Sequence, residues 1–177
     1  RWNTCNVLHV GAAARRVWQF DVRSTAIHAR REQVSRAGEP LPGKIIGKGW
    51  RSVWNPKLNV AWLPPEEVFI RVAQFPRSSP EETRSMVELQ LEKLSPIPVT
   101  QAVWTMHILP GSAAPRPADT ESTGKVEDLQ TVVVVIVART VVEQFLGQLE
   151  GQGFQADRLE LPLVDQLQAT SVTEDGA

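Results

Sequence analysis

Residues 67–109 read EVFIRVAQFPRSSPEETRSMVELQLEKLSPIPVTQAVWTMHIL, a stretch that contains three successive elements. Residues 67–74 are rich in β-branched and aromatic side chains, which predicts a strand. The segment SPEE at residues 79–82 combines an N-cap serine, a proline at the first helical position and a glutamate that completes a capping box. A helix is therefore predicted from this point to about residue 94, and residues 101–109 predict a second strand.

The most apolar segment of the chain follows this stretch. Residues 130–138 (QTVVVVIVA) predict a strand that is apolar on both faces, and therefore central in a sheet covered on two sides. A helix at 140–150, a strand at 154–161 and a short helix at 163–169 are predicted next, whereas the polar residues 110–128 predict a mobile loop. The order strand, helix, strand, strand, helix, strand predicts an α/β or α+β fold around a layered sheet.

The region before this stretch predicts more strands and a hairpin. Alternating or apolar patterns predict strands at residues 5–10, 15–22 and 58–63. The small residues 11–14 predict the turn between the first two strands, and residues 24–33 fit either a further strand or a short helix. Residues 38–56 contain dense glycine and proline, which predicts a loop.

Composition and charge exclude several classes of protein. The chain has 177 residues, which suits one domain or slightly more, and its one cysteine excludes an internal disulfide. It begins with Arg1 and not Met, so we expect it to be a piece of a longer protein. The longest apolar run, Val132–Ala138, is far shorter than the roughly 20 residues of a membrane span.

The net charge of −1 conceals two oppositely charged parts. Residues 1–57 contain eleven Lys or Arg and three Asp or Glu, a net charge of +8, and the remainder has a net charge of −9. The basic part could meet nucleic acid, acidic lipid or an acidic partner, or basic and acidic surfaces of the chain could face each other. The basic residues are scattered, so we expect no nucleic-acid partner.

No residue pattern indicates a catalytic or metal site. The histidines His9, His28 and His107 have no metal-ligand spacing, and the motifs GxSxG, GxxxxGK[ST] and GxGxxG are absent. We therefore expect no catalytic residue, no metal and no cofactor. Trp50 and Trp54, in the basic loop, are either core anchors or part of a contact surface.

The hairpin at residues 7–22, VLHVGAAARRVWQFDV, has the outline of a phosphate loop, because a strand leads into small residues and a second strand follows. Its side chains differ from those of a phosphate loop. No acidic residue occurs before Asp21 to manage a magnesium ion, and alanines in the turn offer no hydroxyl.

The order of the segments resembles the PilM-like and GspL-like proteins, actin-related components of type IV pilus and type II secretion assembly. The resemblance rests on CNVLHVGAAARRVWQFDV, on residues 67–109 and on TVVVVIVARTVVEQFLGQLEGQGFQADRLELPLVDQL. It implies one lobe of an actin-like (RNase H-like) fold with an inserted strand–helix–strand–strand subdomain, as in FtsA. The implied parts are residues 1–57 of the lobe, the inserted subdomain at 58–138, and residues 139–177 that return to the lobe.

The resemblance also identifies a degenerate phosphate loop. Nucleotide-binding members open with an Asp-[Ile/Leu]-Gly-Ser loop, where this chain has His9 in place of the aspartate, followed by Val10, Gly11, Ala12 and Ala13. The length covers about one lobe, so the second phosphate loop and the adenosine pocket are missing. The resemblance therefore favours a non-catalytic scaffold over an enzyme. The alternative is an ATP-binding, actin-like ATPase whose other lobe is absent.

The partners and location are implied by the same resemblance. A scaffold of this kind would bind the cytoplasmic tail of a PilN-like inner-membrane protein, and a secretion ATPase is a further candidate. Four residues are the predicted contacts: Arg71, Leu89, Lys93 and Ile97. The protein would lie in the cytoplasm at the inner face of the inner membrane, attached through its partners.

Overall fold

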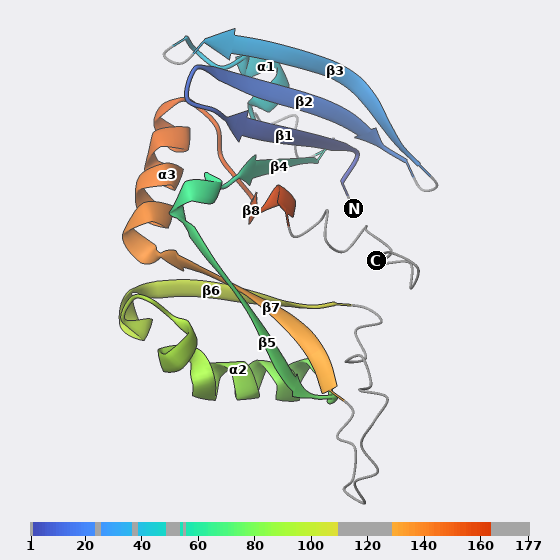
Figure 1. Cartoon of the computed structure of the whole chain (residues 1–177). Coiled ribbons are helices and arrows are strands. Elements are labelled where there is room, and N and C mark those ends of the chain that lie inside the picture. Colours follow the sequence, from blue (N-terminus) through green and yellow to red (C-terminus); the bar gives the residue numbers. More distant parts are fainter. Residues whose placement is uncertain are drawn as a thin grey trace, which may run out of the picture. The chain divides into compact units, whose positions relative to one another are not determined.

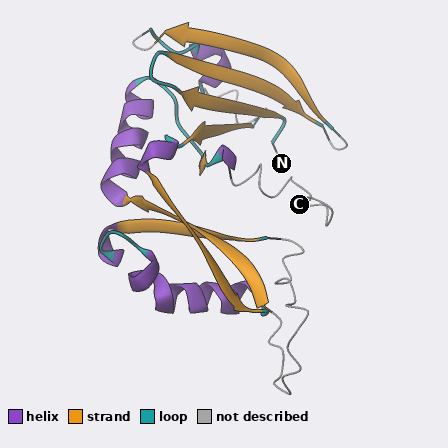
Figure 2. Cartoon of the chain, viewed as in Figure 1, coloured by secondary structure: helices purple, strands orange, loops and turns teal. Residues whose placement is uncertain are grey.

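The computed structural model describes residues 2–23, 26–36, 39–48, 54, 56–109 and 129–163. The fold is mixed α+β, as predicted, with two sheets and few helices (Figure 1 and Figure 2). It divides into two compact units. The first consists of Arg1–Glu67 and Thr140–Pro162, and the second includes Val68–Arg139.

The first unit contains a five-stranded sheet in the order β3-β2-β1-β4-β8. Its strands are β1 (Thr4–Val10), β2 (Ala14–Val22), β3 (Ile27–Arg36), β4 (Lys57–Trp62) and β8 (Arg158–Glu160). The first three strands pair antiparallel through tight connections, whereas β4 pairs parallel with both β1 and β8. The segment predicted as strand or helix is thus the strand β3.

Helices α1 and α3 of the described residues accompany this sheet. The short α1 (Gly43–Ile46) lies in the segment predicted as loop and buries Ile45 and Ile46. Helix α3 (Arg139–Gly151) buries Phe145 and Leu149. The chain leaves α3 through Gly153, whose φ of 79° lies in the left-handed region that favours glycine.

The second unit contains the antiparallel sheet β5-β7-β6 (Figure 1). Its elements are β5 (Val68–Pro76), α2 (Pro80–Leu94), β6 (Ala102–Ile108) and β7 (Leu129–Ala138), with a 3-10 turn at Val99–Gln101. A further 3-10 turn, Pro65–Glu67, ends the first segment of the first unit. Val87 and Leu91 of α2 pack with Val132, Val134 and Ile136 of β7. The valines on the other face of β7, at 133, 135 and 137, are also buried. The prediction of a central strand covered on both faces is therefore confirmed.

The start of α2 matches its prediction in detail. The Ser79 hydroxyl accepts a hydrogen bond from the Glu82 amide at 3.3 Å, and the Glu82 carboxylate accepts one from the Ser79 amide at 3.1 Å. Both bonds of the capping box are present, so two amides that the helix itself cannot pair have acceptors.

The observed division corrects the predicted one at residue 57/58. Strand β4 pairs in parallel with β1, so residues 58–67 belong to the first unit and the second begins at Val68. Parallel pairing needs a long connection, and short-range patterns in the sequence do not indicate which distant strand is the partner. The predicted loop 110–128 and residues 164–169 of the last predicted helix lie outside the described residues.

Two further observations bear on the expectations from sequence. Trp54 is 84% exposed, which excludes a core role for it, and Trp50 lies outside the described residues. None of the helices in the described ranges has the length and apolar character that crossing a bilayer requires.

Candidate functional site

The turn between β1 and β2, at the predicted position of a degenerate phosphate loop, is closed on itself. The Gly11 amide donates to the Ala14 carbonyl at 3.0 Å, so this donor already has an acceptor within the turn. A Cβ on Gly11 would lie 3.1 Å from the same carbonyl oxygen, so a larger residue would need the turn to shift by a few tenths of an ångström. Ala12 and Ala13 are exposed and offer only backbone groups.

His9 belongs to a cluster of aromatic rings on one face of the sheet. Its ring stacks on Trp18, with centroids 6.5 Å apart and an interplanar angle of 21°. It also contacts Trp62 at 5.6 Å, and the two indoles are 5.2 Å apart. The register places His9 beside Trp62 across the parallel β1–β4 pair. The His9 ring therefore packs against two tryptophans on this face of the sheet. The nucleotide-binding members of the resembling family carry an aspartate at this position of the sequence.

The side chains of this turn differ from those of the nucleotide-binding family pattern. The serine and the carboxylate of the family pattern are missing, and the one turn amide with a hydrogen bond pairs internally. In the described ranges, no three His, Cys, Asp or Glu residues are grouped so that they could hold a metal ion.

The four predicted partner contacts all lie in the second unit but do not converge. Leu89 and Lys93 are exposed and one turn apart on α2, on the side opposite the buried Val87. Arg71 is exposed on β5 and pairs with Val134, so it lies on the face of the sheet that α2 covers. Leu89 lies on the side of α2 that faces away from this sheet, and therefore away from Arg71. Ile97 packs against the core of the unit. Three of the four are therefore accessible, on two separate surfaces.

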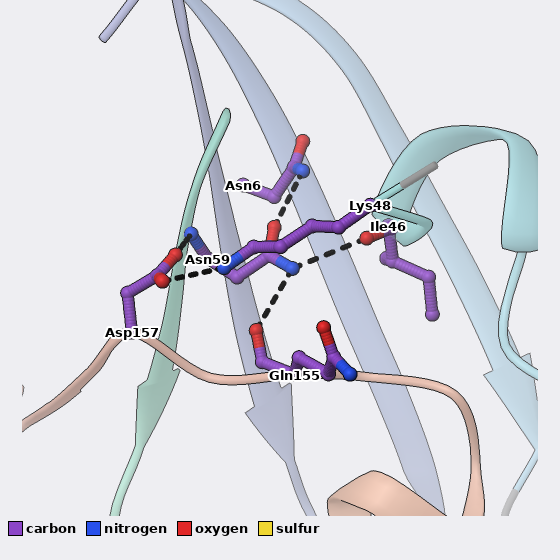
Figure 3. A network of polar contacts seen from close by, with 6 residues as sticks. All are labelled: Asn6, Ile46, Lys48, Asn59, Gln155 and Asp157. Carbon is purple, nitrogen blue, oxygen red and sulfur yellow. Dashed lines mark hydrogen bonds and ion pairs between the residues drawn. The ribbon is translucent and has the colours of Figure 1, made fainter. Parts of the chain in front are cut away.

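A buried amide network in the first unit was not anticipated from the sequence (Figure 3). Asn6 and Asn59 are register partners on β1 and β4, and the Asn6 amide donates to the Asn59 side-chain oxygen at 2.8 Å. Asn59 in turn donates to the backbone carbonyls of Ile46, at 3.1 Å, and Gln155, at 3.0 Å. The network thus ties the end of α1 and the segment before β8 to the centre of the sheet.

The remaining polar side-chain atoms of the two asparagines also have hydrogen-bond partners. Asn6 also donates to the Ile45 carbonyl at 3.2 Å and accepts from the Gln19 side chain at 3.1 Å. Asp157 accepts from the Asn59 backbone amide at 2.8 Å and forms an ion pair with Lys48 (Figure 3). Each asparagine is the single amide side chain in an otherwise largely apolar strand, and this was the available signal. With every side-chain donor of Asn6 and Asn59 paired, these two asparagines stabilise the fold.

Cys5 lies on β1 and is half-buried. Burial raises the pKa of its thiol above the ordinary value, and the positive charge of Arg158 opposes this only in part. The thiol is therefore protonated near neutral pH, which is unsuited to a nucleophile.

Comparisons with known proteins find the fold among solved structures. The PilM-PilN type IV pilus biogenesis complex matches with a TM-score of 0.61 and 16% identity, over 89% of this chain and 47% of that one. The cytoplasmic domain of EpsL, an inner membrane component of the type II secretion system of Vibrio cholerae, matches with a TM-score of 0.52 and 14% identity, over 97% of this chain and 60% of that one. No family model and no curated protein matches the sequence.

These matches confirm the predicted fold, which is that of the PilM-like and GspL-like proteins. The chain spans about half to three fifths of the length of the two structures, 47% and 60%. It therefore corresponds to a part of each.

Proposed function

We propose that this chain is part of a non-catalytic scaffold in a type IV pilus or type II secretion assembly platform. The observation that carries the proposal is the likeness to the PilM-PilN complex over 89% of the chain. The scaffold would hold the cytoplasmic tail of a PilN-like inner-membrane protein, with a secretion ATPase as a second partner. It would lie at the inner face of the inner membrane through these contacts.

The absence of turnover is supported by the turn at Gly11. A phosphate loop needs free amides and a carboxylate near the metal, and this turn pairs its Gly11 amide with Ala14 and carries His9 among tryptophan rings. Tight binding of Mg-ATP by the full-length protein would overturn this part of the proposal. Absence of that binding supports it.

Partner binding is assigned to the exposed surface of α2 around Leu89. This side chain is 85% exposed, on the helix side away from the core, so it contributes little to the fold of the unit. Lys93 lies one turn further on and adds a positive charge beside the apolar side chain. Such a pair suits a peptide tail that carries apolar and acidic side chains.

The test is a titration of the full-length protein with a peptide of the PilN-like tail. We expect saturable binding, and binding about tenfold weaker for Leu89→Ser or Lys93→Glu. Gln90→Ser is the matched control, because Gln90 is exposed on the same helix beside Leu89. A scrambled tail that binds as well as the natural one contradicts the proposed function. Equal binding by Leu89→Ser and Gln90→Ser contradicts only the assigned surface.

A further inference from the structure

Strand β5 forms one edge of the sheet in the second unit, and its outer side is open. In the order β5-β7-β6, its one sheet neighbour among the described residues is β7. Val72 is 65% exposed and Phe69 is 38% exposed, so apolar side chains of this edge meet solvent. A long apolar edge strand either pairs with a further strand or is protected by charges, a proline or a bulge.

The hydrogen bonds of β7 show which backbone groups of β5 point outward. The Leu109 amide donates to the Thr131 carbonyl at 2.9 Å, so the odd-numbered residues of β7 bond toward β6 and the even-numbered ones toward β5. The register pairs these even-numbered residues with odd-numbered residues of β5. The N–H and C=O groups of Val68, Ile70 and Val72 therefore point away from the sheet.

Strand β3, an edge of the sheet in the first unit, is protected in ways that β5 is not. It carries Arg30, Arg31 and Arg36, and its register with β2 is interrupted by a shift. The register of β5 with β7 is continuous, and Arg71 is the one charged residue of β5. Addition of a further strand is therefore opposed at β3 and open at β5.

Helix α2 covers the end of β5 but not its beginning. Phe75 is 1% exposed and belongs to the core that α2 packs on. Phe69 and Arg71 lie on the same face of the sheet and are exposed, so a further strand can approach this half of β5 without meeting α2. The Arg71 guanidinium donates to the Ile70 carbonyl at 3.1 Å, and none of the ion pairs among the described residues includes it.

We propose that two copies of this protein pair through the beginning of β5, antiparallel, with Ile70 opposite Ile70 of the partner subunit. Val68, Ile70 and Val72 of each copy supply the backbone hydrogen bonds, since their N–H and C=O groups point outward. The interface uses the same surface of both copies and closes on itself as a dimer. This pairing goes beyond the proposed scaffold role and does not rest on it.

The side chains of β5 are self-complementary in this register. Val72 lies opposite Val68 of the partner subunit, which gives its exposed side chain an apolar neighbour. Arg71 lies opposite Phe69 of the partner subunit, and a guanidinium is attracted to the face of an aromatic ring. A register with Arg71 opposite itself would place like charges together. A register with Val72 opposite itself would place Phe69 against Phe75 of the partner subunit, which α2 covers.

Sedimentation velocity of the full-length protein over a series of concentrations measures the association, and we expect a dimer. Val72→Lys places a charge in the paired strand and should weaken dimerisation at least about tenfold. Ile27→Lys is the matched control, because Ile27 is a β-branched residue of the edge strand β3 and is 69% exposed. It should dimerise as the unmodified protein does. Equal losses in the two variants overturn the proposal. A protein that stays monomeric also overturns it, and leaves the edge to a strand of a different protein.

A disulfide experiment locates the two-fold axis. In a background without other cysteines, Ile70→Cys places two thiols on opposite residues whose Cα atoms are about 5.5 Å apart, within reach of a disulfide. Gln74→Cys is the matched control, because Gln74 is exposed on the same strand but its two copies would lie roughly 27 Å apart. Mild oxidation should link Ile70→Cys and not Gln74→Cys. Equal linking of both variants, or of neither, contradicts the pairing. The comparison of Val72→Lys with Ile27→Lys remains decisive if Ile70→Cys does not fold, because both of those positions are exposed.

Discussion

The two units bury their sheets by different means. The first buries Asn6, Gln19 and Asn59 in a connected amide network, together with Thr4 and Arg15. The second has an apolar core in which the buried polar pair is Gln130 and Thr83, joined by a hydrogen bond of 2.7 Å. The difference follows the topology of the sheets.

Parallel pairing explains the polar core of the first unit. Strands β1, β4 and β8 run parallel, so long connections must join them, and two segments of these connections, the last turn of α1 and the residues before β8, bring backbone carbonyls into the interior. The asparagine amides donate to three such carbonyls, those of Ile45, Ile46 and Gln155. In the antiparallel second unit the ladder itself pairs the backbone, and apolar side chains fill the core. The carbonyls that these connections leave without backbone partners are thus paired by buried side-chain donors.

The largest expected effect tests this requirement directly. Asn59→Ala leaves the Ile46 and Gln155 carbonyls and the Asn6 amide without partners, so we expect a loss of about 4 kcal/mol in the free energy of unfolding. Urea denaturation measures it, with the exposed Gln90→Ala as control. A loss equal to that of the control would mean that the network does not support the first unit. In the double variant Asn6→Ala/Asn59→Ala, the loss of free energy of unfolding should be smaller than the sum of the losses in the two single variants.

The same contrast explains how much the sequence could predict. In the second unit, the predicted β7 at 130–138 is observed at Leu129–Ala138, and the helix predicted from SPEE is observed at Pro80–Leu94. Local periodicity and a capping box carry that information. In the first unit, the sequence predicted the β1–β2 hairpin but neither the α1 helix nor the sheet partner of β4.

The candidate site shows the same limit. The degenerate turn was predicted from residues that adjoin one another, and the resemblance indicated what is missing from it. The burial of Arg15 depends on Arg36, Glu39 and Gln152, which are distant along the chain, and no local pattern relates them. Likewise, the packing of His9 on Trp62 requires the parallel register of β1 with β4. Contacts between distant segments therefore account for what the sequence alone did not predict.

The apolar core of the second unit supports the next prediction. Leu91 of α2 is 2% exposed and Leu89 is 85% exposed, two residues apart on one helix. We expect Leu91→Ala to lower the free energy of unfolding by about 3 kcal/mol and Leu89→Ala by less than about 0.5 kcal/mol. Denaturation curves of the two variants compare the same leucine-to-alanine change at a buried and at an exposed position. Similar losses in both would contradict the packing of α2 on the sheet.

A smaller effect is expected at the beginning of the same helix. Ser79→Ala removes the oxygen that accepts from the Glu82 amide, which should lower the free energy of unfolding by about 1 kcal/mol. Ser85→Ala is the matched control, since the Ser85 hydroxyl donates to the Glu81 carbonyl inside the helix and caps no amide. Thermal or urea unfolding measures the difference in stability between Ser79→Ala and Ser85→Ala. If Ser85→Ala is the more destabilising change, the capping box does not stabilise α2.

The smallest effect concerns Cys5, because the pKa of its thiol reports how well β1 is shielded from water. Burial raises the pKa of the thiol in the folded chain, so folding favours the protonated form. The corresponding stability is present below the unfolded pKa and is lost as pH rises through the folded pKa. Alkylation of this single cysteine should therefore have a higher pH midpoint in the native chain than in urea. A native midpoint at or below the unfolded one contradicts the burial. Arg158→Gln removes the opposing positive charge and should raise the native midpoint further, which separates the charge from the burial.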